Sequence, residues 1–171
     1  TKLLQKPNYH INDQEIDLTP YLPKYTWDTR FALFEGTQDD KAEILTVSTS
    51  NQTTLFEHTK SENIKAPSLE GEQAATLAQK AVNEMTGTNQ KFDIIKKIAH
   101  TTPANRTDWQ ITFELANMND ADPVKPRIDI LITGNQITGQ KQYLHIPEKW
   151  INQQTINAQE LLTIAGIESI I

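Results

Sequence analysis

The sequence predicts an α+β fold built from two tandem units, in each of which an antiparallel sheet is packed by a helix. Three observations predict this class. Short segments with alternating apolar and polar residues recur between polar turns, as is typical of half-buried antiparallel strands. One longer stretch instead carries its apolar residues at helical spacing. Finally, two short motifs occur twice, in the same order and at almost the same separation.

The first unit is predicted to contain three strands. Residues 1–24 are polar and form an entry segment with one short strand between Tyr9 and Ile16. Strands then follow at 25–34, 42–49 and 53–59, the first of which alternates Trp27 and Phe31 with polar residues. We expect this tryptophan to pack in the core.

The clearest helix is predicted from Glu70 to Met85. Its apolar stripe consists of Ala74, Ala75, Leu77, Ala78, Ala81, Val82 and Met85. Ser68 is the expected N-cap, and Gly87 stands just past the end, where a left-handed residue is favoured. The helix would close the first unit, which spans 25–87.

The second unit, 88–171, is predicted to return to strands. They are expected at 92–99, 107–115, 128–133 and 136–146, with a Gly134-Asn135 turn before the last. Trp109 alternates with apolar residues and is again a predicted core residue. From Ala158 to Ile171 the apolar residues recur at helical spacing, which indicates a second helix. Two expectations stay open for it: the helix packs on its own sheet, or the apolar tail 161–171 leads into a membrane helix.

An internal repeat underlies the division into units. The pattern W-x-x-x-F-x-L begins at Trp27 and again at Trp109, 82 positions later. The pattern T-x-N-Q-x-T begins at Thr49 and again at Thr133, 84 positions later. Strand sequences resemble one another by composition alone, but two ordered matches at nearly one offset favour duplication of a unit of about 80 residues. Each unit is marginal in size by itself, so we expect the two units to share a sheet or an interface.

Composition restricts the function classes. The net charge of -6 and the pI near 5.2 argue against a nucleic-acid or anionic-membrane surface. Cysteine is absent, so thiolate metal sites and cysteine nucleophiles are excluded. No apolar run reaches the ~18 residues that a membrane helix needs. The first residue is not Met, and we expect the chain to be a piece of a longer protein.

Motifs that carry chemistry are not found. The sequence contains no nucleophile elbow, phosphate-binding loop or zinc-protease helix motif. His58 and His145 each have carboxylates nearby in sequence, as a proton-transfer pair would, but hydrogen-bonded surface histidines are more common. The acidic loop 117–122 lacks the glycine and the distal glutamate of a calcium loop, which favours a solvated turn. We therefore predict no catalytic residue, no cofactor and no metal.

A set of short motifs resembles a known arrangement. They are W-x-x-R-F at 27–31, F-x-H at 56–58, A-x-x-x-A-x-x-A at 74–81, R-x-D-W at 106–109, G-N-Q-I at 134–137 and Y-L-H-I-P-E-K-W at 143–150. In this order they resemble the PepSY-like, cystatin-like tandem domain of bacterial membrane proteins of the CPBP family, relatives of the CAAX prenyl proteases. The resemblance covers about residues 27–150.

The resemblance implies an extracytoplasmic accessory domain tethered to a membrane protease. The family's catalytic paired glutamates and membrane-embedded histidines have no match here, so the chain itself would not be an enzyme. Its partner would be a peptide or protein, including the parent membrane domain, with the membrane close by through flanking segments and with no nucleic acid. The candidate contacts to a ligand or partner are His58, Arg106, His145 and Trp150.

Two other functions stay open. A free-standing extracytoplasmic protein could bind a small molecule in a pocket of the curved sheet, and such a pocket would be apolar with a few convergent polar groups. A hydrolase could use an unobvious carboxylate–histidine pair, and its site would contain strongly shifted pKa values.

Overall fold

The computed structural model describes residues 27–34, 41–50, 54–87, 90–116 and 124–148, and the backbone of two short strands near the N-terminus. Those two strands, β1 (Tyr9–Ile11) and β2 (Gln14–Ile16), pair with each other. The single strand predicted between these residues is therefore a hairpin of two.

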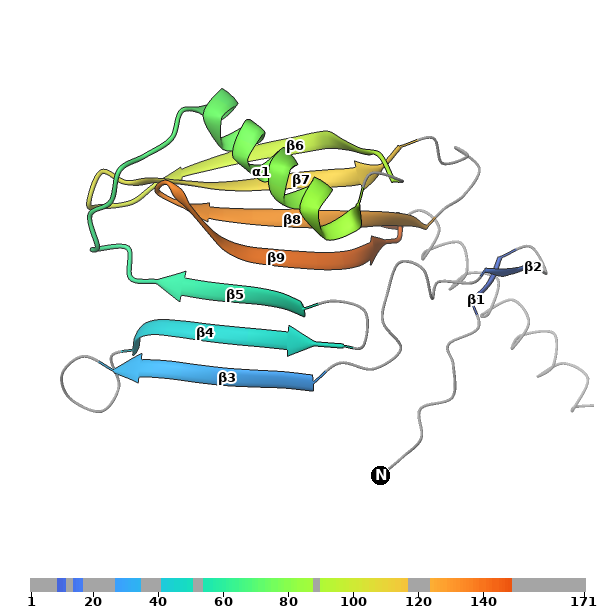
Figure 1. Ribbon diagram of the computed structural model, residues 1–171, viewed down its shortest axis with the longest axis horizontal. Helices are drawn as coiled ribbons and strands as arrows, with labels where there is room; N and C mark the ends of the chain where they lie inside the picture. Colours follow the sequence, from blue (N-terminus) through green and yellow to red (C-terminus); the bar gives the residue numbers. More distant parts are fainter. Residues whose placement is uncertain are drawn as a thin grey trace, which may run out of the picture.

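The main element is a seven-stranded antiparallel sheet (Figure 1). Its strands are β3 (Trp27–Phe34), β4 (Lys41–Thr49), β5 (Thr54–Lys60), β6 (Phe92–Thr101), β7 (Thr107–Leu115), β8 (Lys125–Thr133) and β9 (Gln136–His145). They lie in the order β3-β4-β5-β9-β8-β7-β6. The predicted α+β class is confirmed, and each predicted strand from 25–34 onward is present with slightly shifted ends.

The sheet is continuous, so the strands assigned to the two predicted units share one sheet, which is one of the arrangements expected from their small size. The strands of both predicted units join where β5 pairs with β9. This pairing is short, with Phe56 opposite Gln140 and Glu57 opposite Gly139. Because it joins segments more than 80 residues apart, no local sequence pattern could reveal it.

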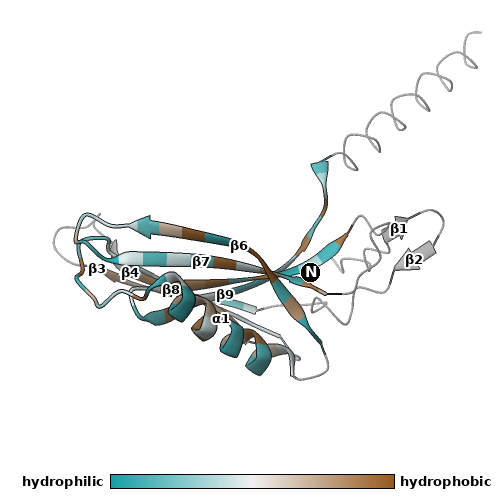
Figure 2. Ribbon diagram, turned by 90° about the horizontal axis from the view of Figure 1, so that it is seen from above, coloured by the Kyte–Doolittle hydropathy of each residue, from teal (hydrophilic) through white to brown (hydrophobic). Residues whose placement is uncertain are grey.

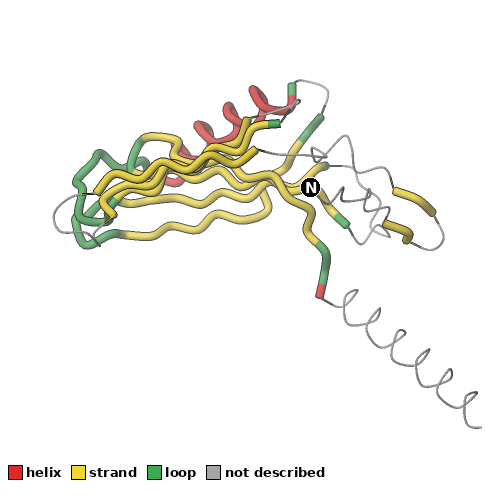
Figure 3. Tube along the Cα trace, turned by 90° about the horizontal axis from the view of Figure 1, so that it is seen from below, coloured by secondary structure: helices red, strands yellow, loops and turns green. Residues whose placement is uncertain are grey.

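One helix, α1 (Gly71–Thr86), packs on the sheet. It lies on one side of the sheet only, over β6, β7 and β8 (Figures 2 and 3). Gln73 caps its first turn, since its side-chain oxygen accepts a hydrogen bond from the Glu70 backbone N–H at 3.1 Å. The N-cap is thus Glu70 and not Ser68 as predicted. The predicted C-terminal Gly87 is confirmed, with φ of 69°.

The core lies between α1 and the second half of the sheet. The helix contributes small side chains, so its backbone can approach the larger residues of β7 and β8 closely. The buried cluster consists of Ala74, Ala75, Ala78, Ala81, Val82, Phe92, Ile111, Phe113, Ile128, Ile130 and Ile132. Trp109 is half-buried at its margin, which agrees with the predicted core position.

The half of the sheet formed by β3, β4 and β5 differs from the half under α1, because large apolar side chains of β3 are exposed. On β3, Trp27 is 80% exposed, Phe31 58% and Leu33 57%. The prediction that Trp27 packs in the core is therefore wrong. The alternation was identified correctly, but alternation shows only that one face is apolar and not that another element covers it.

One row of cross-strand partners crosses both halves on the α1 side of the sheet. It runs from Thr29 through Val47, Phe56, Gln140 and Ile130 to Ile111. Thr29 on β3 and Ile111 on β7 are the two ends of this row, and each is the third residue from its centre between Phe56 and Gln140. They are 82 positions apart, the same separation as the repeated W-x-x-x-F-x-L motif. A two-fold rotation about the centre of the row would therefore bring β3 onto β7, with Trp27 at the position of Trp109 and Phe31 at the position of Phe113.

Candidate functional site

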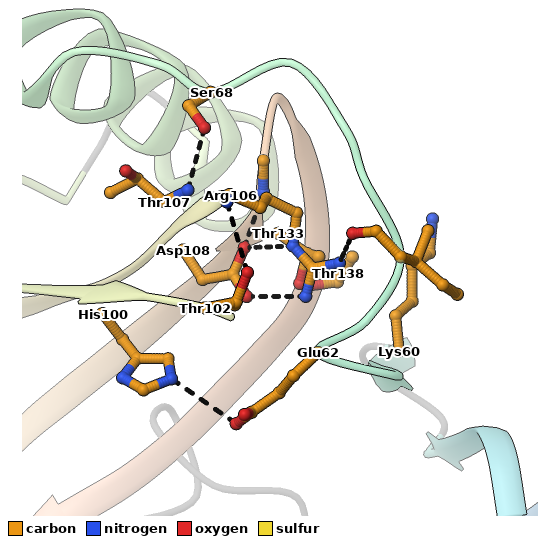
Figure 4. A network of polar contacts seen from close by, with 12 residues as sticks. Lys60, Glu62, Ser68, His100, Thr102, Arg106, Thr107, Asp108, Thr133 and Thr138 are labelled. Atoms are coloured by element: carbon orange, nitrogen blue, oxygen red, sulfur yellow. Dashed lines mark hydrogen bonds and ion pairs between the residues drawn. The ribbon is translucent and has the colours of Figure 1, made fainter. Parts of the chain in front are cut away.

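Arg106 lies at the centre of a group of polar contacts at one end of the sheet (Figure 4). We call this group, which consists of Arg106, Asp108 and the backbone carbonyls of Ser61 and Ile64, the clamp. Its side chain is 1% exposed. The guanidinium donates two hydrogen bonds to Asp108, from Nε to Oδ1 at 2.8 Å and from Nη2 to Oδ2 at 2.9 Å. Its Nη1 donates to the backbone carbonyls of Ser61 and Ile64. The hydrogen bond to Asp108 raises the pKa of Arg106, which therefore stays charged.

The clamp fixes the segment 61–70, which connects β5 to α1. Ser68 Oγ accepts a hydrogen bond from the Thr107 N–H at 2.8 Å, and Trp109 Nε1 donates to the Leu69 carbonyl at 3.0 Å. The Gly134 N–H donates to Asp108 Oδ1 at 2.8 Å. Gly134 has φ of 62°, and a Cβ there would lie 2.6 Å from the Pro67 carbonyl oxygen, so the turn needs glycine. The connection is thereby held against both hairpins of the second half.

A groove of about 300 Å³ lies beside this clamp. It is lined by residues of β5, β6, β7 and β8, by one residue of β9 and by Glu62. Its lining includes Ile98, Trp109 and Leu131 as apolar groups and Glu57, Glu62 and Asp108 as carboxylates. Each of these carboxylates has a cationic or histidine partner, namely Lys141, His100 and Arg106 respectively. The groove is therefore polar, and its charges are matched internally.

His58 lines the groove and pairs with Glu43 on the neighbouring strand. Nε2 lies 2.7 Å from Glu43 Oε2, and both side chains are 30% exposed. Glu57 and Glu62, the carboxylates near His58 in sequence, pair instead with Lys141 and His100. Glu43 was missed because the contact is diagonal across β4 and β5, where His58 stands opposite Leu45. A strand register, once assigned, would have indicated it.

His145 lies at the far end of β9, away from His58 and Arg106. It is paired across the strands with Lys125, and Arg127 and Glu114 are close enough to influence it. Arg127 donates to Glu114, from Nε to Oε2, at 2.8 Å. Burial, followed by the charge of Arg127, lowers the pKa of His145. The candidate residues thus fall into two separate places, with His58 and Arg106 at one and His145 at the other.

Asp129 is a buried carboxylate that the sequence analysis did not single out. It accepts hydrogen bonds from Gln110 Nε2 at 2.9 Å and from the Tyr143 hydroxyl at 3.3 Å. Burial, then the charge of Asp129, raises the pKa of Tyr143, which keeps the phenol protonated as a donor. The signal was present in the sequence, since Asp129 interrupts the otherwise apolar run of β8.

Lowering the pH is expected to destabilise the fold through His145. Its pKa is below the ordinary 6.5 in the folded state, so at pH about 6 the unfolded chain binds a proton more readily than the folded chain. Stability is unaffected above about pH 7.5 and falls as the pH drops through 6.5, until the folded state also protonates. His145→Gln should therefore reduce the loss of melting temperature between about pH 7.5 and 5.5. His100→Gln, on an exposed side chain, controls for loss of a histidine, and an unchanged pH profile in His145→Gln would contradict the prediction.

The edge strand β3 forms a second candidate site, separate from the clamp and the groove. In the described part of the sheet it pairs only with β4. By the register, its exposed side chains Trp27, Phe31 and Leu33 share the sheet face that α1 covers further along. We call these three residues the β3 apolar row. An exposed apolar row on an edge strand is typical of a surface that contacts another chain or segment.

Several predictions concern residues outside the described part of the chain. Trp150, the predicted turn at 117–122 and the predicted helix from Ala158 to Ile171 all lie there. Among the described residues, no helix is long and apolar enough to cross a membrane. Within the same residues, no three His, Asp or Glu side chains are grouped as a metal ion would require.

Comparisons with protein-family models, with curated proteins and with solved structures found no match to this chain. The groove, the clamp and the β3 apolar row are therefore the features from which we infer a function.

Proposed function

We propose that the chain is a non-catalytic accessory domain that binds a peptide or protein partner through the β3 apolar row. The observation that carries this proposal is the exposure of Trp27, Phe31 and Leu33 on an edge strand. Aromatic residues dominate binding energy at protein interfaces. An edge strand also offers backbone hydrogen bonds to an added strand, so both affinity and side-chain specificity are available there.

The proposed setting is outside the cytoplasm, as part of a bacterial membrane protein of the CPBP type. The support is the ordered set of motifs between Trp27 and Trp150, which resembles the PepSY-like tandem domains of that family. In this setting the partner would be a peptide substrate or the parent membrane domain.

We also propose that the sheet consists of two diverged PepSY-like units. Two matching observations support this. The row of cross-strand partners places β3 and β7 in correspondence at an offset of 82, the offset of their shared motif. At the junction, Phe56 stands opposite Gln140, which is 84 positions later, the offset of the T-x-N-Q-x-T motif. Equivalent residues would thus meet at the centre of the sheet, as a two-fold axis between the halves requires.

A small-molecule binding protein is the second candidate, favoured by the groove beside the clamp. Its volume of about 300 Å³ is at the lower limit for small-molecule sites. Its carboxylates are already paired, so a charged ligand would have to displace internal partners. We therefore place this function second.

The two candidates are separated by one binding experiment. Random peptides displayed on phage and selected on the full chain are expected to yield binders. Phe31→Asp should weaken them at least about tenfold, because a charge replaces an apolar contact. The matched control is Ile95→Asp on the opposite edge strand, where the side chain is 45% exposed. Binders that tolerate Phe31→Asp but are lost in Leu131→Trp, which fills the groove, would favour the second candidate. A failure to select any binder would contradict the first.

A further inference from the structure

We propose that the chain's own segment 155–170 docks on the β3 apolar row and competes there with the partner. The segment lies outside the described residues, whereas the β3 apolar row and the half of the sheet that α1 covers lie within them. This inference depends on the proposed function in one respect only, namely that partner and segment share a surface.

The symmetry of the sheet indicates where a second helix would pack, namely over β3 and β4. The strand order from β3 to β7 is symmetric about the β5–β9 junction, where the two central strands are antiparallel. A two-fold axis at that junction exchanges β7 and β8 with β3 and β4 and keeps each face of the sheet on its own side. The helix α1 packs on β8, β7 and β6, and of these three strands β7 and β8 have counterparts in β3 and β4. The exchanged position lies over the exposed Trp27, Phe31 and Leu33.

The same two-fold symmetry identifies the segment that would pack over β3 and β4. The helix α1 follows β5, and the equivalent segment follows β9. Adding the offset of 84, which separates Phe56 from Gln140, to the range of α1 gives residues 155–170. Four residues are identical at this offset: Ala74 and Ala158, Leu77 and Leu161, Ala81 and Ala165, Glu84 and Glu168. Three of these four pairs correspond to positions of α1 that are buried or half-buried against the sheet. The central Ala78, fully buried, corresponds to Leu162.

The connection is long enough. Between the end of β5 at Lys60 and the start of α1 at Gly71 lie residues 61–70, and this length is sufficient to place α1 over the other half of the sheet. Residues 146–154, between the end of β9 at His145 and position 155, form a connection only one residue shorter. The required distance is the same by symmetry, and at ~3.3–3.6 Å per residue nine residues reach nearly as far as ten.

Trp27 would then have the role that Trp109 has in the covered half. The ring of Trp109 lies under the first residue of α1, since a Cβ on Gly71 would stand 3.2 Å from it. Its Nε1 donates to the Leu69 carbonyl in the connection. Trp27 is at the corresponding place in β3 and is 80% exposed. The docked segment gives this indole a covering element, and a partner must displace that element before it can bind.

Cross-linking in the full chain tests the docking directly, because the chain has no cysteine of its own. A double variant, Phe31→Cys with Leu162→Cys, treated with a short bismaleimide, is expected to cross-link within one molecule at least about fivefold faster than the control pair. The control is Arg30→Cys with Leu162→Cys, because Arg30 is next to Phe31 but on the opposite face. Equal rates for the two pairs, or links formed only between two molecules, would overturn the inference.

A second measurement distinguishes this inference from the proposed function. Leu161→Asp with Leu162→Asp should release the segment and strengthen binding of the selected peptides at least about fivefold. Asn157→Asp is the control, because it corresponds to the exposed Gln73 of α1. Peptides that bind equally to all three chains overturn competition but leave the proposed function standing. The Phe31 cross-link without peptide binding to any chain overturns the proposed function and leaves the docking standing.

Discussion

Replacing Arg106 by alanine is expected to lower the free energy of unfolding by about 3–5 kcal/mol. The substitution removes four hydrogen bonds at once, two to Asp108 and one each to the carbonyls of Ser61 and Ile64. It also leaves the carboxylate of Asp108, 22% exposed, without its cation. Removing one member of a buried ion pair is costly because the remaining charge is uncompensated. Urea unfolding followed by circular dichroism measures the change.

Arg106→Lys is the informative control for this prediction. Lysine keeps the positive charge near Asp108 but cannot reproduce the planar fork that reaches both carboxylate oxygens and the two carbonyls. We expect a loss intermediate between the wild type and Arg106→Ala. A loss below about 1 kcal/mol in Arg106→Ala would show that the clamp contributes little.

The local elements could be predicted from sequence because each has its own periodicity. The strand Thr107–Leu115 was predicted with both ends correct, since Trp109, Ile111 and Phe113 alternate without interruption. The helix Gly71–Thr86 was predicted within one residue because an alanine stripe and Gly87 mark it. These features depend on residues close in sequence, and a single sequence contains them.

The arrangement of those elements could not be predicted in the same way. Trp27 and Trp109 have the same sequence context, yet one is 80% exposed and the other packs beside the core. The difference is the presence of α1, which is a property of the assembled fold. The junction between β5 and β9 is likewise decided by global packing, because its backbone ladder is only two residue pairs long.

The candidate site shows the same limit. His58, Arg106 and His145 were selected from short motifs, and the structure places only the first two near each other. Arg106 proved to be almost fully buried, with its donors engaged by the segment that precedes α1. That contact joins residues more than 40 positions apart. Motif order alone therefore could not separate a clamp from a ligand contact.

Replacing Phe113 by alanine is expected to cost about 3–5 kcal/mol of unfolding free energy. Phe113 is fully buried in the cluster between α1 and the sheet, opposite Ile128 on β8. The neighbouring alanines of α1 are too short to fill the space, so the cavity would persist and add to the lost burial of the ring. Chemical unfolding at constant pH measures the loss.

The matched control is Ile95→Ala, because Ile95 lies on the adjacent strand β6 but is 45% exposed. We expect it to cost less than about 1 kcal/mol, since the residue gives up little buried area. If the two substitutions cost the same, the core would not lie between α1 and β6–β8. The comparison also bears on the first half of the sheet. Phe31 corresponds to Phe113, and in a chain whose segment 155–170 docks as proposed, Phe31→Ala should cost more than Ile95→Ala although Phe31 is the more exposed of the two.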